Sequence, residues 1–119
     1  MKRYRIALTV ALLMTALLAL SHSQAQEKPK GNAEAGKTLY MANCKKCHGE
    51  LGEGVPKMYK LVKATLVHLG SKEAQAKTDD EIRKSMTDGV GKMQPIKDPK
   101  PLTPEEMDNI IAFTRTLKQ

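Results

Sequence analysis

Apolar residues recur with the spacing of an α-helix in three stretches of the chain, and each stretch follows a residue that caps helix N-termini. The first follows Asn32 and runs to about Asn43. The second follows Thr78, which forms a Thr-x-x-Glu capping box with Glu81, and it stops at Gly89. These signals predict a helix in each of the two stretches.

A third helix is predicted after Thr103, where a capping box with Glu106 is combined with Pro104 at the first helical position. Its apolar side is marked by Met107, Ile110, Ile111, Phe113, Thr114 and Leu117. Short helical turns are expected within residues 56–69 and 71–76, and no stretch shows the alternation typical of strands. The fold class is therefore predicted to be all-α, with three main helices, short helical turns and long loops.

The loops are long for so small a protein. Gly49, Gly52, Gly54 and Pro56 rule out regular structure where they occur, and residues 89–102 contain two Gly and three Pro. The 119 residues include one Phe, three Tyr and no Trp, and a small domain buries only a limited fraction of its surface. Since long loops in a small domain usually wrap around something, we expect an apolar cofactor, a metal or a disulfide to complete the core.

The N-terminus has the three-part pattern of a secretory signal peptide. It begins with Lys2, Arg3 and Arg5, continues in a nearly unbroken apolar run of 15 residues that ends at Leu20, and then reaches small residues before a cleavage site after Ala25. A retained membrane anchor is the alternative. It is disfavoured because about 20 apolar residues are needed to span a bilayer.

The chain is thus divided into a cleavable signal peptide at 1–25, a flexible leader at 26–31 and a single domain at 32–119. We expect the mature protein in the periplasm, without a stable membrane span. Cleavage removes three of the 20 basic residues and none of the 13 acidic ones, which leaves a net charge of +4. This mild excess includes no dense basic run with interleaved aromatics, so nucleic acid is excluded as a partner.

The stretch ANCKKCHGEL, residues 42–51, holds both cysteines and one of the three histidines. A disulfide between Cys44 and Cys47 fits an oxidising compartment but would close only a very small loop. A redox dithiol favours a βαβ context, which this helical pattern lacks. A structural zinc site needs four ligands, and only Cys44, Cys47 and His48 lie together here.

Cys-x-x-Cys-His is also the attachment motif of haem c. In this interpretation the thiols of Cys44 and Cys47 form thioether bonds with the two vinyl groups of haem, and Lys45 and Lys46 set the spacing. His48 then donates a ring nitrogen to the iron. Because attachment takes place after export, the signal peptide and the motif support each other, and we predict one covalently bound haem c.

The candidates for the sixth iron ligand in the mature chain are Met41, Met58, Met86, Met93, Met107 and His68. Met41, Met86 and Met107 lie in predicted helices, where Met usually fills the core. Met58 is ambiguous, and His68 is expected at the surface or as a hydrogen-bond donor to a haem propionate. Met93 lies in the Gly/Pro-rich loop 89–102, so we predict His48 and Met93 as the two iron ligands.

The sequence resembles the small single-haem class I cytochromes c from about Asn32 to Leu117. The resemblance is carried by NAEAGKTLYMANCKKCHGELGEG, by TDDEIRKSMTDGVGKMQP and by LTPEEMDNIIAFTRTL. It implies the cytochrome c fold, with helices and long loops around one covalently bound haem. The first and last helices are then expected to cross, with Gly36 and Tyr40 meeting Ile110 and Phe113.

The resemblance also implies that a proline carbonyl, here that of Pro56, accepts a hydrogen bond from the ring of His48. Two positions depart from the family pattern. Gln94 separates Met93 from the following proline, and the aliphatic Ile96 stands near the place of a frequent aromatic. We therefore expect a slightly different setting of the ligand loop.

The leading functional prediction is an exported one-electron carrier and not an enzyme. Its partners would be redox proteins, and acidic docking faces would suit the lysines near the presumed haem rim: Lys45, Lys46, Lys92 and Lys97. The protein would act as a monomer or as a subunit of a redox complex. The alternatives are a haem enzyme or gas sensor with a labile sixth ligand, and a disulfide-bonded binding module without haem. No distal His/Arg pair supports an enzyme, because Arg83 and Arg115 are expected to be solvated.

Overall fold

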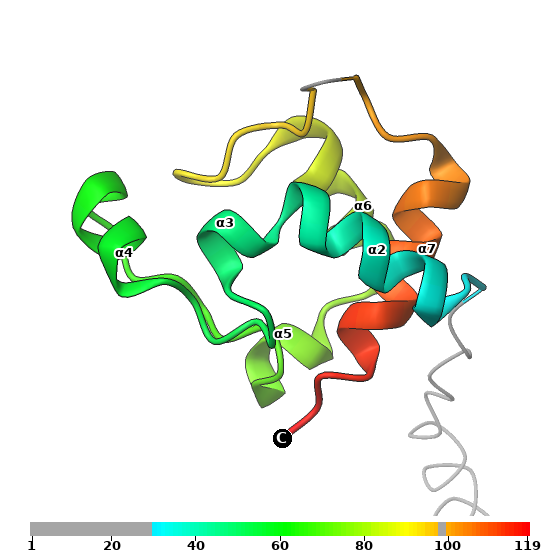
Figure 1. Cartoon of the computed structure of the whole chain (residues 1–119), viewed down its shortest axis with the longest axis horizontal. Helices are drawn as coiled ribbons and strands as arrows, with labels where there is room; N and C mark the ends of the chain where they lie inside the picture. The colour runs from blue at the N-terminus through cyan, green and yellow to red at the C-terminus, as the bar shows by residue number, and fades with distance from the viewer. Residues whose placement is uncertain (1–29, 98–99) are drawn as a thin grey trace, which may run out of the picture.

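The computed structural model describes residues 30–97 and 100–119, and the predicted signal peptide lies outside this part of the chain. The helices in it are α2 (Ala33–Asn43), α3 (Lys45–His48), α4 (Pro56–Val62), α5 (Lys72–Ala76), α6 (Asp79–Asp88) and α7 (Pro104–Arg115). In the described ranges, β structure is limited to an isolated bridge between Val90 and Met93. The predicted all-α class and its three main helices, α2, α6 and α7, are confirmed (Figure 1).

The helix starts follow from the capping residues that the sequence predicts. The Asn32 side chain accepts hydrogen bonds from the backbone N–H groups of Glu34 and Ala35 at the start of α2. Complete capping boxes begin α6 at Thr78 and α7 at Thr103. Each box satisfies N–H groups that would otherwise lack a partner at a helix end.

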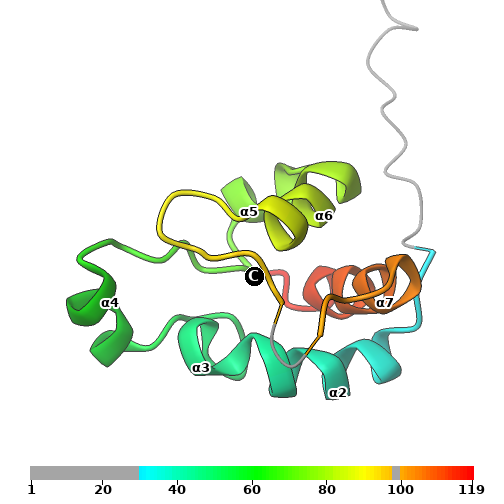
Figure 2. The same ribbon diagram turned by 90° about the horizontal axis from the view of Figure 1, so that it is seen from above.

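Helices α2 and α7 pack against each other (Figures 1 and 2). The ring centroids of Tyr40 and Phe113 are 5.0 Å apart with a tilted geometry, which is favourable for aromatic pairs. The buried core cluster consists of Tyr40, Met86, Met107, Ile110, Ile111 and Phe113. The expected meeting of the first and last helices is therefore confirmed.

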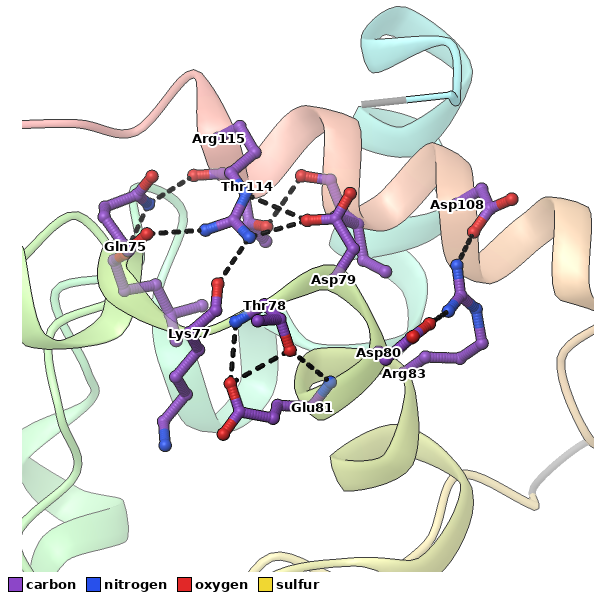
Figure 3. A network of polar contacts seen from close by, with 12 residues as sticks. Gln75, Lys77, Thr78, Asp79, Asp80, Glu81, Arg83, Asp108, Thr114 and Arg115 are labelled. Atoms are coloured by element: carbon purple, nitrogen blue, oxygen red, sulfur yellow. Dashed lines mark hydrogen bonds and ion pairs between the residues drawn. The ribbon is translucent and has the colours of Figure 1, made fainter. Parts of the chain in front are cut away.

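A polar network joins α5 and α6 to α7 (Figure 3). The Arg115 guanidinium donates to the carboxylate of Asp79 at 2.6 Å and to the backbone carbonyls of Gln75 at 2.9 Å and Lys77 at 2.6 Å. The Arg115 side chain is only 13% exposed. The prediction that this arginine is solvated is wrong, because the last turn of α5 and the residue after it supply carbonyls that no local pattern reveals.

Arg83 makes a second connection in the same network. Its guanidinium bridges Asp80 on its own helix and Asp108 on α7 (Figure 3). These two arginines tie α6 to α7. No helix in the described ranges is long and apolar enough to cross a membrane.

Candidate functional site

The Cys-x-x-Cys-His segment continues directly from α2. Cys44 closes α2 by donating its N–H to the carbonyl of Tyr40 at 2.8 Å, and its own carbonyl accepts from the N–H of His48 at 2.9 Å. The short helix α3 that results was not predicted from the sequence. Because α3 is a single helical turn, it places the thiols of Cys44 and Cys47 and the ring of His48 on adjacent positions.

The two thiols are free. Cys44 and Cys47 are not joined by a disulfide. Burial, reinforced by the nearby Cys47, raises the pKa of the Cys44 thiol to about 12. A thiol in such apolar surroundings stays protonated at neutral pH. A disulfide is absent from this geometry, and both sulfur atoms are available for thioether bonds.

The ring of His48 is half-buried and uncharged at neutral pH, because burial lowers its pKa. Its Nδ1 is buried and has no hydrogen-bond partner within the described ranges. The expected hydrogen bond to the carbonyl of Pro56 is therefore not formed, since Pro56 is the first residue of α4 and its carbonyl begins the hydrogen-bond ladder of that helix. A neutral imidazole has the donor chemistry of a metal ligand.

Met93 is held on a tight turn at the end of α6. Val90 and Met93 exchange both backbone hydrogen bonds, at 3.0 and 2.9 Å. Gly91 has φ +56° at the first of the two central positions, a conformation that glycine adopts without strain. The N–H of Ile96 donates to the carbonyl of Met86 at 2.9 Å and ties the loop back to α6. The sequence predicts a loop here but not this hairpin.

Met93 and Cys44 both pack against the core cluster. The structure thus brings two residues that are 49 positions apart in the sequence onto the same core cluster. Gly89 makes this geometry feasible, because a Cβ there would lie 2.5 Å from the carbonyl oxygen of Met93. The altered spacing at Gln94 is accommodated with Gln94 exposed and Pro95 and Ile96 half-buried.

The other candidate ligands are engaged elsewhere. Met86 and Met107 are buried in the core and Met41 packs against it, as predicted for core methionines. Met58 is half-buried on α4. Nδ1 of His68 accepts the N–H of Gly70 at 2.9 Å, and its Nε2 lies 2.9 Å from Nε2 of Gln119. His68 therefore links the loop before α5 to Gln119.

The predicted docking lysines lie on the surface. All four side chains are exposed: Lys45, Lys46, Lys92 and Lys97. Lys45 pairs with Glu50 in the loop after His48. Lys92 is the second central residue of the turn that carries Met93. No group of three or more His, Cys, Asp or Glu side chains in the described chain is arranged to hold a metal ion.

The donor set fits haem c. The thiols of Cys44 and Cys47 are free, the adjacent imidazole is neutral and has an unsatisfied buried nitrogen, and a methionine on a constrained turn packs on the same core. The fold and the site together define a helical domain built for a covalently attached haem.

Comparisons with known proteins agree with this class. The family model for cytochrome c matches residues 33–118. The chain is 34% identical to cytochrome c-554(547) of Halothiobacillus neapolitanus over 90 residues, which cover 74% of this chain and 99% of that protein. Among solved structures, the KustC0563 c-type cytochrome is 30% identical, with a TM-score of 0.58 over 71% of this chain and 98% of the other.

The protein belongs to the cytochrome c family. Its cofactor is accordingly haem c, for which Cys44 and Cys47 have the spacing of the attachment motif. It is a c-type cytochrome, a class whose members are in general electron-transfer proteins.

Proposed function

We propose that this protein is an exported, periplasmic one-electron carrier whose single haem iron is ligated by His48 and Met93. When bound, haem c supplies an iron that takes up and releases one electron. The observation that carries the proposal is the packing of Met93 and Cys44 on one core cluster, with the neutral ring of His48 one residue beyond Cys47.

Each residue has a distinct task in this proposal. Cys44 and Cys47 hold the cofactor through their sulfur atoms, and the rigid turn of α3 sets their spacing. His48 offers an uncharged ring nitrogen. Met93 would supply the second iron ligand, a thioether, which raises the reduction potential relative to histidine. With both positions filled, the site has no vacancy for a substrate, so the carrier role is favoured over an enzyme or a gas sensor.

A ligand exchange experiment tests the assignment of Met93. The Met93→Ala variant, matured with haem in a bacterial periplasm, should bind carbon monoxide when reduced and lose its low-spin spectrum. Met58→Ala is the matched control, because it removes a half-buried methionine from α4 and should leave the spectrum unchanged. A Met93→Ala protein with an unaltered spectrum would show that another group ligates the iron.

Export rests on the sequence pattern of residues 1–25. Mass spectrometry of the haem-containing protein recovered from a periplasmic extract should give a mature N-terminus at Gln26. A protein that retains residues 1–25 and sediments with the membrane would contradict cleavage.

The exposed lysines on the ligand loop would attract a redox partner with an acidic docking face. Replacing Lys92 and Lys97 by Ala should weaken the dependence of the electron-transfer rate on ionic strength, because such attraction acts on association and is screened by salt. The control is the double variant of Lys37 and Lys118, two exposed lysines outside this loop. If the electron-transfer rate of the Lys92/Lys97 variant depends on ionic strength as steeply as that of the unmodified protein, the two residues are not part of the docking face.

A further inference from the structure

The loop that follows His48 is folded back onto the haem-attachment motif. The N–H of Gly54 donates to the carbonyl of His48 at 2.6 Å, and the N–H of Val55 donates to the carbonyl of Cys47 at 3.1 Å. These bonds close residues 49–54 into a compact turn that starts at Gly49, which has φ +80°. The direction in which the chain leaves His48 is therefore set by this turn.

Two tyrosine hydroxyls hold the turn at its two ends. From α2, the hydroxyl of Tyr40 donates to the carbonyl of Gly49 at 2.8 Å. From α4, the hydroxyl of Tyr59 donates to the carbonyl of Glu53 at 3.0 Å. The first bond is buried and the second is exposed. The Tyr40 bond therefore has the larger effect on the turn, since a buried carbonyl that loses its donor finds no water to replace it.

Tyr40 reaches the turn after His48 from within the core. Its side chain is fully buried, and its ring contacts the ring of Phe113. The N–H of His48 is bonded to the carbonyl of Cys44, and the N–H of Gly49 to the carbonyl of Lys45. The hydroxyl of Tyr40 holds the next carbonyl along the chain, that of Gly49, one residue beyond His48.

We propose that Tyr40 is a positioning residue for the iron ligand His48. Its hydroxyl fixes the Gly49 carbonyl, and this bond holds the backbone of His48 in the orientation that presents the ring. The carbonyl of His48 is held in the same turn by the N–H of Gly54, so the bond from Tyr40 acts on the backbone directly beside the ligand. The inference deepens the proposed function and rests on the role of His48 as an iron ligand.

The test compares three variants of the haem-containing protein: Tyr40→Phe, Tyr59→Phe and Phe113→Leu. Each of the tyrosine variants removes one hydroxyl, and Phe113→Leu loosens the aromatic contact while it keeps the hydroxyl of Tyr40. The primary readout is the set of hyperfine-shifted NMR resonances of the His48 ring in the oxidised protein, which report the orientation of the ring at the iron. The second is the exchange rate of the Gly54 and Val55 amides.

Tyr40→Phe should shift the His48 resonances and speed the exchange of the Gly54 and Val55 amides by about tenfold, as expected from the loss of one buried hydrogen bond. Tyr59→Phe should leave the His48 resonances in place. Phe113→Leu should lower the denaturation midpoint without moving those resonances.

Two results would overturn the inference while the proposed ligation stands. One is a Tyr40→Phe protein with unchanged His48 resonances, and the other is an equal shift in all three variants, which would mean general loosening of the core. If the unmodified protein lacks hyperfine-shifted His48 resonances, the ligation by His48 fails, and both proposals are overturned together.

Discussion

Gly36 of α2 lies directly against the backbone of Asn109 in α7. A Cβ atom at Gly36 would come well within 3.0 Å of the Asn109 carbonyl, a distance that real Cβ contacts do not show. The two central helices thus cross at a point where only glycine fits. Because Cys44 closes α2, this crossing also determines where the haem-attachment segment begins.

Gly36→Ala is predicted to lower the free energy of unfolding by about 3 kcal/mol, because the added methyl group forces two helix backbones apart. Denaturation with urea, followed by circular dichroism, measures the change. The neighbouring exposed residue supplies the control, and Lys37→Ala should stay within about 0.5 kcal/mol of the unmodified protein. Equal stability of Gly36→Ala and Lys37→Ala would contradict the close crossing.

Arg115→Ala is predicted to destabilise the fold by about 2 kcal/mol or more, because it leaves the carbonyls of Gln75 and Lys77 and the carboxylate of Asp79 without this donor. The same urea titration measures the loss. Lys84→Ala is the matched control, since this side chain is 78% exposed and makes one surface ion pair. A loss no greater than that of Lys84→Ala would mean that the network in Figure 3 has little weight in stability.

Gly89→Ala is predicted to displace Met93 from its position on the core, because the new Cβ would collide with the Met93 carbonyl oxygen and Gly89 has φ +79°. The expected outcome is binding of carbon monoxide by the reduced protein. Gly91→Ala is the contrasting variant. Nothing lies within 4 Å of its Cβ position, so it should cost about 1 kcal/mol for the left-handed backbone and keep the ligand. Carbon monoxide binding by Gly91→Ala but not by Gly89→Ala would contradict this geometry.

The capping boxes make the stability of the fold depend on pH in the acid range. Hydrogen bonds from the backbone and side chain of Thr78 lower the pKa of Glu81 below its ordinary value of 4.5, and those of Thr103 do the same for Glu106. A carboxyl group with a lowered folded-state pKa stabilises the fold above its unfolded-state pKa. That contribution decreases as the pH falls below about 4.5, and it is lost once the pH falls through the lower folded-state pKa.

Urea midpoints measured from pH 7 down to pH 3 should therefore fall less steeply in the Glu81→Gln, Glu106→Gln double variant than in the unmodified protein. Glu105 provides the control: it is exposed and is not part of the capping box, so Glu105→Gln should leave the slope as it is. Identical slopes in the double variant and the unmodified protein would exclude the capping boxes as the source of the acid dependence.

The sequence predicts the local features of this protein well. Asn32, Thr78 and Thr103 begin helices where their capping chemistry places them, because these signals act within one helical turn. Met86 and Met107 are core residues, as their helical positions indicate. The motif at Cys44 and the family match agree on haem c.

The features that the sequence did not predict depend on contacts that reach beyond one helical turn. The burial of Arg115 requires the carbonyls of Gln75 in α5 and of Lys77 just after it, about 40 residues earlier in the chain. The bond from Tyr40 to Gly49 depends on the turn that α3 introduces. The hairpin at Met93 depends on how Ile96 returns to α6, and none of these contacts leaves a periodic trace in the sequence.

The absorption spectrum of the reduced, haem-containing protein, with and without carbon monoxide, tests the central claim most directly. Ligation by both His48 and Met93 predicts a sharp low-spin spectrum that carbon monoxide does not change. Ready formation of a carbon monoxide complex by the unmodified protein would mean that the sixth position is open or labile, and it would contradict the assignment as a closed one-electron carrier.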